Sequence, residues 1–167
     1  MQGGSFWEMK IEYIKVPLHK YTFSRKPIKE WVEKNSKGRV LNLFAGKIKL
    51  NLDEIRVDSD NTMNADYYMD AYDFVKECKN KFDTIILDPP YAYRKSMEMY
   101  NGHKASRLNM IKDLIPNILN ENGIVITFGY HSVSMGKSRG FNQEKILLMS
   151  HGGAIHDTIV VIERRED

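Results

Sequence analysis

The stretch DTIILDPPY, residues 83–91, determines how the rest of the chain is interpreted. Residues 84–87 form a short run that is almost entirely apolar and β-branched, which is typical of a strand buried on both faces in a parallel sheet. Asp88 follows at once, and the two prolines after it oppose strand pairing or a helix at that point. We therefore expect a stiff turn that holds a carboxylate, a proline carbonyl and an aromatic ring at the carboxyl end of a buried strand.

Such a turn suits a flat base that carries an exocyclic amine. In open α/β sheets, ligands bind outside the carboxyl ends of the strands. We expect the Asp88 carboxylate and the Pro89 carbonyl to accept the two N–H bonds of the amine, and the Tyr91 ring to stack on the base. The competing interpretation, a merely rigid turn, is disfavoured because the tetrapeptide directly follows a buried strand.

Composition sets wider limits. A chain of 167 residues with 42% hydrophobic residues fits one globular domain with a substantial core. No apolar run approaches the roughly 20 residues of a membrane span, and the polar N-terminus does not resemble a signal peptide. The single cysteine, Cys78, excludes an internal disulfide and agrees with a reducing, cytoplasmic location. Its position in a predicted helix indicates a side chain that packs in the core and not a nucleophile.

The remaining sequence predicts an α/β fold. Residues 1–22 are expected to form an N-terminal extension, in which residues 9–16 allow an extra strand, and residues 23–167 one domain. Ser24 has the side chain of an N-cap and Gly38 can end a helix. Helices are expected at residues 24–38, 72–79 and 106–119, and strands at residues 39–46, 54–58, 65–71, 84–87, 124–128, 145–149 and 158–162.

Two connections depart from an ordinary α/β pattern. Only about ten residues separate Phe44 from the strand at 54–58, so the first crossover helix must be a stub. Residues 91–105 are expected to be a loop, and residues 129–140 replace a proper helix with glycine and serine.

Basic residues gather in these two loops. The net charge of +3 is too small to indicate nucleic-acid binding by itself, and such charge is usually a solvated face. Both loops, however, follow neighbouring strands and should emerge beside Tyr91. We therefore expect one positive rim for a nucleic-acid substrate, formed by Arg94, Lys95, Lys104, Arg107, Lys137 and Arg139.

Several segments resemble the class I S-adenosylmethionine-dependent methyltransferases that modify exocyclic amines of bases. The DPPY of residues 88–91 resembles motif IV of that family, and Asp70-Ala71 resembles motif III. The segment RVLNLFAG, residues 39–46, resembles motif I with three departures: an asparagine at 42 replaces the acid, a lysine at 47 replaces a small residue, and an isoleucine at 48 replaces the second glycine. Asp58, which ends the next strand, suits the ribose hydroxyls of a cofactor.

The resemblance implies a Rossmann-like, mostly parallel seven-stranded sheet in the order 3-2-1-4-5-7-6, with S-adenosylmethionine as cofactor and no metal. It assigns cofactor binding to Phe23, Pro27, Asn42, Phe44, Ala45, Gly46, Asp58, Asp70 and Ala71, and catalysis to Asp88, Pro89, Pro90 and Tyr91. Substrate binding is assigned to Tyr93, Arg94, Lys95, Lys137, Arg139, His151 and His156, of which the two histidines are either substrate contacts or turn residues.

The expected function is methylation of a base amine in DNA or RNA. Adenine N6 is favoured because DPPY is the commonest form of the motif among family members acting there, with guanine N2 as the alternative. The chain is too short for a separate target-recognition domain, so we expect a folded RNA substrate or a partner subunit that supplies specificity. The second hypothesis is a degenerate, non-catalytic subunit that binds nucleic acid or a partner protein, which the altered motif I favours.

Overall fold

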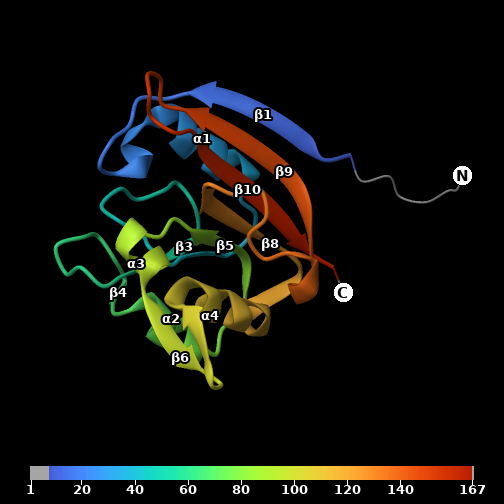
Figure 1. Cartoon of the computed structure of the whole chain (residues 1–167). Helices are drawn as coiled ribbons and strands as arrows, with labels where there is room; N and C mark the ends of the chain where they lie inside the picture. The colour runs from blue at the N-terminus through green and yellow to red at the C-terminus, as the bar shows by residue number, and fades with distance from the viewer. Residues whose placement is uncertain (1–7, 167) are drawn as a thin grey trace, which may run out of the picture.

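A twisted eight-stranded sheet forms the centre of the computed structural model, which describes residues 8–166 (Figure 1). Its order is β1-β9-β10-β8-β5-β2-β3-β4. Neighbouring strands are parallel except at β10, which is antiparallel to both β8 and β9. The strands are β1 (Lys10–Lys15), β2 (Val40–Asn42), β3 (Glu54–Asp58), β4 (Tyr67–Tyr68), β5 (Phe82–Leu87), β8 (Leu119–Gly129), β9 (Phe141–Ser150) and β10 (Thr158–Arg165).

The seven strands from β2 onward lie in the expected order 3-2-1-4-5-7-6. The eighth strand, β1, pairs in parallel with β9 at the outer edge, where the sequence allows an extra strand. Residues 1–7 of the expected extension lie outside the described residues.

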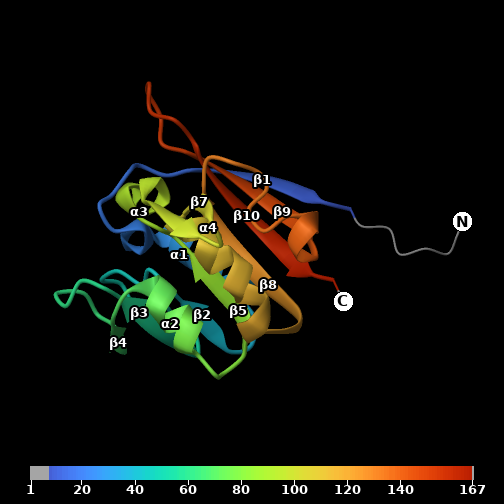
Figure 2. The ribbon, with the colours of Figure 1, turned by 60° about the horizontal axis from the view of Figure 1, so that its bottom comes forward.

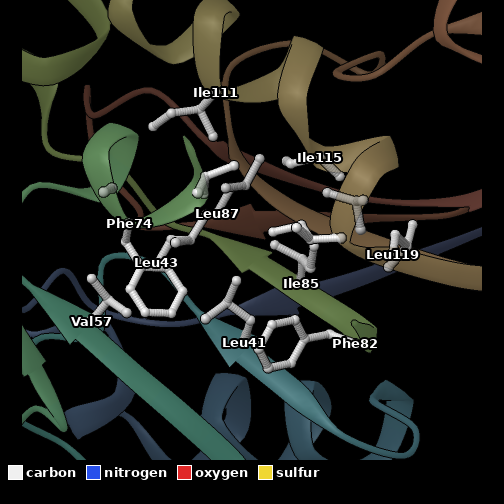
Figure 3. Close-up of a cluster of buried hydrophobic side chains, with 14 of the residues drawn as sticks. Leu41, Leu43, Val57, Phe74, Phe82, Ile85, Leu87, Ile111, Ile115 and Leu119 are labelled. Atoms are coloured by element: carbon white, nitrogen blue, oxygen red, sulfur yellow. The ribbon is translucent and has the colours of Figure 1, made fainter. Parts of the chain in front are cut away.

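Helices cover both faces of the sheet. They are α1 (Lys26–Asn35), α2 (Ala71–Glu77), α3 (Tyr91–Lys95) and α4 (Arg107–Leu114), with short 3₁₀ turns η1 (Thr22–Ser24), η2 (Ile115–Ile118) and η3 (Lys137–Arg139). Side chains alternate along β5, because Ile85 and Leu87 face one layer while Ile86 faces the other. The first layer contains α2 and α4 and the second contains α1 (Figure 2). Figure 3 shows the first core, where Ile111 and Ile115 pack over Leu87 and Ile85.

Three expectations about local structure are wrong. The helix α1 begins at Lys26 with Arg25 as its N-cap, so Ser24 belongs to the preceding 3₁₀ turn, and it ends at Asn35 before Gly38. The prolines do not prevent a helix after the turn: Pro90, with an extended backbone, is the N-cap of α3, where its missing N–H is not needed.

The third wrong expectation is the long loop at residues 91–105. After α3 the chain forms a hairpin of β6 (Met97–Tyr100) and β7 (His103–Ser106). Its turn is Asn101-Gly102, and both residues have positive φ angles, 49° and 82°. An Asn-Gly pair with this backbone is a strong hairpin signal that the sequence interpretation missed.

None of the helices within residues 8–166 combines the length and apolar character needed to cross a bilayer.

Candidate active site

A cavity of about 480 Å³ opens where β2, β3 and β5 end. These strands are parallel neighbours, so their carboxyl ends meet at one edge of the sheet. The volume lies within the range of small-molecule sites, about 300–1,000 Å³. The predicted residues that line it are Phe23, Phe44, Ala45, Gly46, Asp58, Asp70, Ala71, Asp88, Pro89, Pro90 and Tyr93.

Two residues assigned to the cofactor do not line this cavity. Pro27 is exposed in the first turn of α1. Asn42 is fully buried in the sheet, where its amide donates to the carboxylate of Glu54 over 3.4 Å. Conversely, the sequence interpretation missed the lining residues Lys20, Tyr21, Thr22, Ser59 and Met63. Tyr21 and Thr22 belong to a segment that no strand or helix pattern marks.

The turn after β2 leaves space for a ligand and helps to fix the carboxylate of Asp58, which ends β3. Gly46 has a φ of 67°, and a side chain added there would meet no atom within 4 Å, so the backbone borders open space. Its N–H donates to Oδ2 of Asp58 over 2.9 Å, and the N–H of Asp60 donates to Oδ1 over 2.9 Å. The Asp58 carboxylate is therefore held at the end of β3 with further lone pairs available for hydroxyl donors.

A buried ion pair holds this turn in place. Of the residues 43–53 between β2 and β3, all described, none forms the expected stub helix. Instead, the Arg56 side chain, 2% exposed, pairs with the fully buried Glu54 at 2.8 Å. The Arg56 guanidinium also donates to the carbonyls of Ala45, Gly46 and Asn64 over 2.7–3.0 Å.

This network also gives a reason for the departure at position 42. An acid at Asn42 would face the Glu54 carboxylate within the sheet, whereas an amide can donate to it. Glu54 and Arg56 are two residues apart on one strand and so share a face. Two opposite charges on one face of a buried strand were the available signal for this network, and it was missed.

Asp70 is committed to the protein more fully than expected. Its carboxylate caps α2 by accepting from the N–H groups of Tyr72 and Asp73. It also pairs with Arg107, whose Nη2 lies 2.9 Å from Oδ2. Arg107 contacts Glu98 of the hairpin as well, so it is part of an internal network and not a free cation of the rim.

Asp88 is the carboxylate of the turn after β5. Burial raises the pKa of its carboxyl group, against the opposing effects of the Thr22 hydroxyl and the Arg94 charge. Within the described residues, the Pro89 carbonyl accepts none of the backbone or side-chain hydrogen bonds, whereas the Pro90 carbonyl accepts from Tyr93 and Arg94 in α3. An acid and a carbonyl acceptor therefore stand together at the cavity.

The two tyrosines of α3 are placed differently from expectation. Tyr93, assigned to the substrate, lines the cavity and packs edge-on against Phe44, with ring centroids 4.9 Å apart. Burial raises the pKa of the Tyr93 hydroxyl, which therefore stays neutral. Tyr91 is 65% exposed and lines a second cavity instead.

The positive rim does not form as predicted. Besides Arg107, Arg139 is paired, with its Nε 2.9 Å from Oδ1 of Asp113. Arg94 and Lys95 do line one cavity together with Tyr91. Lys104 and Lys137 are exposed and line neither of these two cavities.

The two histidines also differ in environment. The His151 ring lies between the Val16 carbonyl at 2.9 Å and the Thr158 hydroxyl at 2.7 Å, so it joins the first strand's end to the β9–β10 turn. It lines a small cavity of about 90 Å³ that also contains Asp88 and Arg94. His156 is exposed on the same turn.

The search against protein-family models finds no match, and neither does the search of curated proteins. Solved structures do match. The N-methyltransferase NodS from Bradyrhizobium japonicum WM9 superposes with a TM-score of 0.60 at 10% identity, over 90% of this chain and 100% of that one. The 1,6-didemethyltoxoflavin-N1-methyltransferase from Burkholderia thailandensis, solved with its substrate and S-adenosylhomocysteine, gives 0.59 at 11% identity, over 85% and 78%.

A third neighbour is longer than this chain. The protein SMU.776, solved as a complex with S-adenosylhomocysteine, gives a TM-score of 0.57 at 16% identity, over 83% of this chain and 48% of that one. At these identities the likeness concerns the fold. The chain has the Rossmann-like fold of S-adenosylmethionine-dependent methyltransferases.

Proposed function

We propose that this protein is an S-adenosylmethionine-dependent methyltransferase that acts on an exocyclic base amine in nucleic acid, with adenine N6 favoured over guanine N2. One observation carries the proposal. A single cavity at the carboxyl edge of the sheet is lined both by Gly46 and Asp58, which suit the cofactor, and by Asp88 and Pro89, which suit the target amine.

The residues present fit the cofactor. The open space beside Gly46 admits a ligand close to the backbone, and the fixed Asp58 carboxylate can accept from ribose hydroxyls. Apolar side chains such as Phe44, Ile48 and Met63 line the same cavity and suit an adenine ring. The Asp70 carboxylate already serves as a helix cap and an ion-pair partner, so its proposed contact with the adenine amine would use a remaining lone pair.

When bound, the cofactor would supply an electrophilic methyl group. The chain's own residues have the task of orienting the nucleophile. The Asp88 carboxylate and the Pro89 carbonyl accept the two N–H bonds of the target amine, which directs its lone pair into the cavity. As the nitrogen becomes positively charged, Asp88 in its ionised form would stabilise that charge.

Two observations support a base beside Asp88. Asp88 lines the main cavity and also a small cavity where Arg94 and Phe128 lie. Tyr91 and Tyr130 expose their rings nearby on the same edge, which suits stacking on a flat base. Recognition of a particular sequence or RNA fold is assigned to the substrate's own shape or to a partner subunit.

The test separates cofactor binding from methyl transfer. Calorimetry with S-adenosylhomocysteine should show saturable binding that Asp58→Ala weakens about tenfold or more, because a hydrogen bond to a charged group is lost. Asp88→Ala should leave that affinity within a few-fold and abolish transfer of a labelled methyl group to DNA or RNA. Asp157→Ala, an exposed acid on the β9–β10 turn, is the control and should change neither.

Two results would contradict the proposal. If Asp88→Ala weakened cofactor binding as much as Asp58→Ala does, Asp88 would belong to the cofactor site. If the wild-type protein bound no S-adenosylhomocysteine at millimolar concentration, the alternative of a non-catalytic subunit would be favoured. The absent helix in residues 43–53 and the Asp70–Arg107 pair already point in that direction.

A further inference from the structure

A second cavity, of about 350 Å³, lies beside the active-site turn. Its walls come from α3, from the first turns of α4, and from the end of β8 with the segment that follows it (Figure 2). Three cations, Arg94, Lys95 and Lys112, line it. Among the described residues that line this cavity there is no aspartate or glutamate.

Lys112 is the most unusual of these cations. It is half-buried on the face of α4 that also carries Leu108, and among residues 8–166 its ammonium group makes neither a hydrogen bond nor an ion pair. Burial lowers the pKa of Lys112, and the charges of Arg139 and Arg94 lower it further, whereas Glu163 opposes them. A cation in this position gains stability from any anion that enters.

The acid that opposes the pKa shift of Lys112 is already used by the backbone. Glu163 is 1% exposed, and its carboxylate accepts from the N–H groups of Ser134, Met135 and Gly136 over 2.8–3.3 Å. These three bonds hold the loop that forms one wall of the cavity. Glu163 therefore reduces the positive potential without closing the site.

The other two cations are held by aromatic rings. The Arg94 guanidinium lies 5.4 Å from the ring centroid of Tyr130, and the Lys95 ammonium lies 5.4 Å from that of Tyr91. Aromatic rings orient a cation without cancelling its charge. Arg94 also donates to the Phe128 carbonyl over 3.0 Å, and its Nε is buried without a hydrogen-bond partner in the described part of the chain.

We propose that this cavity binds a phosphate group of the nucleotide that carries the target base, with Lys112 as the direct contact and Arg94 and Lys95 beside it. The inference rests on the proposed function. Arg94 connects the two sites, because it lines this cavity and also the small cavity that contains Asp88. A base whose amine reaches Asp88 would thus have its phosphate within the reach of three cations that form no ion pair in the described part of the chain.

The phosphate can belong to a nucleic-acid strand or to a free nucleotide, and the experiment distinguishes them. Affinity for a single-stranded adenine-containing oligonucleotide, for adenosine 5′-monophosphate and for adenosine is measured at several salt concentrations. The variants are Lys112→Met and Lys112→Arg, and the control is Lys34→Met, which removes an exposed lysine on α1.

Lys112→Met should lower the slope of log affinity against log salt by about 0.7, the value of one phosphate contact on a single strand. Lys112→Arg should restore the slope, and Lys34→Met should leave it unchanged. Lys112→Met should melt no lower than the wild type, since it removes a charge that burial disfavours, and should bind S-adenosylhomocysteine normally. An effect of Lys112→Met on the monophosphate, with no oligonucleotide binding by the wild type, would identify a free nucleotide as the source.

An unchanged slope and unchanged affinity for both phosphate ligands in Lys112→Met would overturn the inference. In that case, normal S-adenosylhomocysteine binding and methyl transfer would leave the proposed function intact. Failure of the proposed function itself would be seen in the wild-type protein, which would bind no S-adenosylhomocysteine.

Discussion

Removing the charge of Arg56 should destabilise the protein more than any change at a surface ion pair. Arg56→Met keeps the length of the side chain but leaves the buried Glu54 carboxylate without its 2.8 Å partner. The carbonyls of Ala45, Gly46 and Asn64 lose a donor as well. Breaking a buried pair from one side costs about 3–5 kcal/mol, which is a large part of a typical unfolding free energy of about 5–15 kcal/mol.

Urea denaturation measures this cost. The control is Lys26→Met, because Lys26 pairs with Glu30 on the surface, where the two side chains are 83% and 62% exposed. That change should alter the unfolding free energy by no more than about 0.5 kcal/mol. Arg56→Met should also weaken S-adenosylhomocysteine binding, because the turn at Gly46 loses its support.

A second variant tests the reasoning more directly. Glu54→Leu combined with Arg56→Met removes both charges, and so the double variant should be more stable than Arg56→Met alone. Two results would refute the argument: a cost below about 1 kcal/mol for Arg56→Met, or a double variant that loses the sum of the two single losses.

Two further predictions concern buried carboxylates. The raised pKa of Asp88 means that its contribution to stability is present below its unfolded pKa, about 3.9, and is lost as the pH rises through the folded value. Asp88→Asn should therefore raise the unfolding free energy relative to wild type in urea titrations, by an amount that grows as the pH rises above about 4 and levels off above the folded pKa. Methyl transfer should fall in the same variant, and a stability difference independent of pH would disprove this reasoning. Glu163→Gln replaces an acceptor of three N–H groups by an amide with one oxygen, and should cost about 1–3 kcal/mol. Hydrogen exchange at residues 134–136 should become faster, and unchanged protection would contradict the role given to Glu163.

The positions of the buried strands and the place of the site follow from patterns along the chain, whereas the order of the strands was expected from the family resemblance. The apolar run of β5 could be identified because strands buried on both faces have little alternation, and the strand at Glu54–Asp58 could be identified because charged and apolar residues alternate along it. Turn residues after each strand then had to meet at one edge, since parallel strands share their carboxyl ends. For that reason Gly46, Asp58, Asp70 and Asp88 were predicted together, and the structure brings them to one cavity.

Local chemistry explains the errors in α3 and in the hairpin. The prediction treated the prolines after Asp88 as barriers, although a proline fits an N-cap, and it overlooked the Asn101-Gly102 turn. Both signals are present in the sequence. The prediction instead followed the general rules that prolines oppose helices and that a long segment without a clear pattern is a loop.

Which charges are free could not be predicted, because that depends on distant partners. Arg107 and Arg139 are basic residues like any others until the fold brings α4 into place, where Arg107 meets Asp70 and Asp113 meets Arg139. Lys112 gave no signal in the sequence, yet the fold leaves it half-buried in a cavity without acids. The sequence alone determined the strands of the sheet and the chemistry of the turns, since both depend on local periodicity and backbone freedom. Only the tertiary structure decided which charges neutralise one another, since ion pairing depends on distances between segments far apart in the chain.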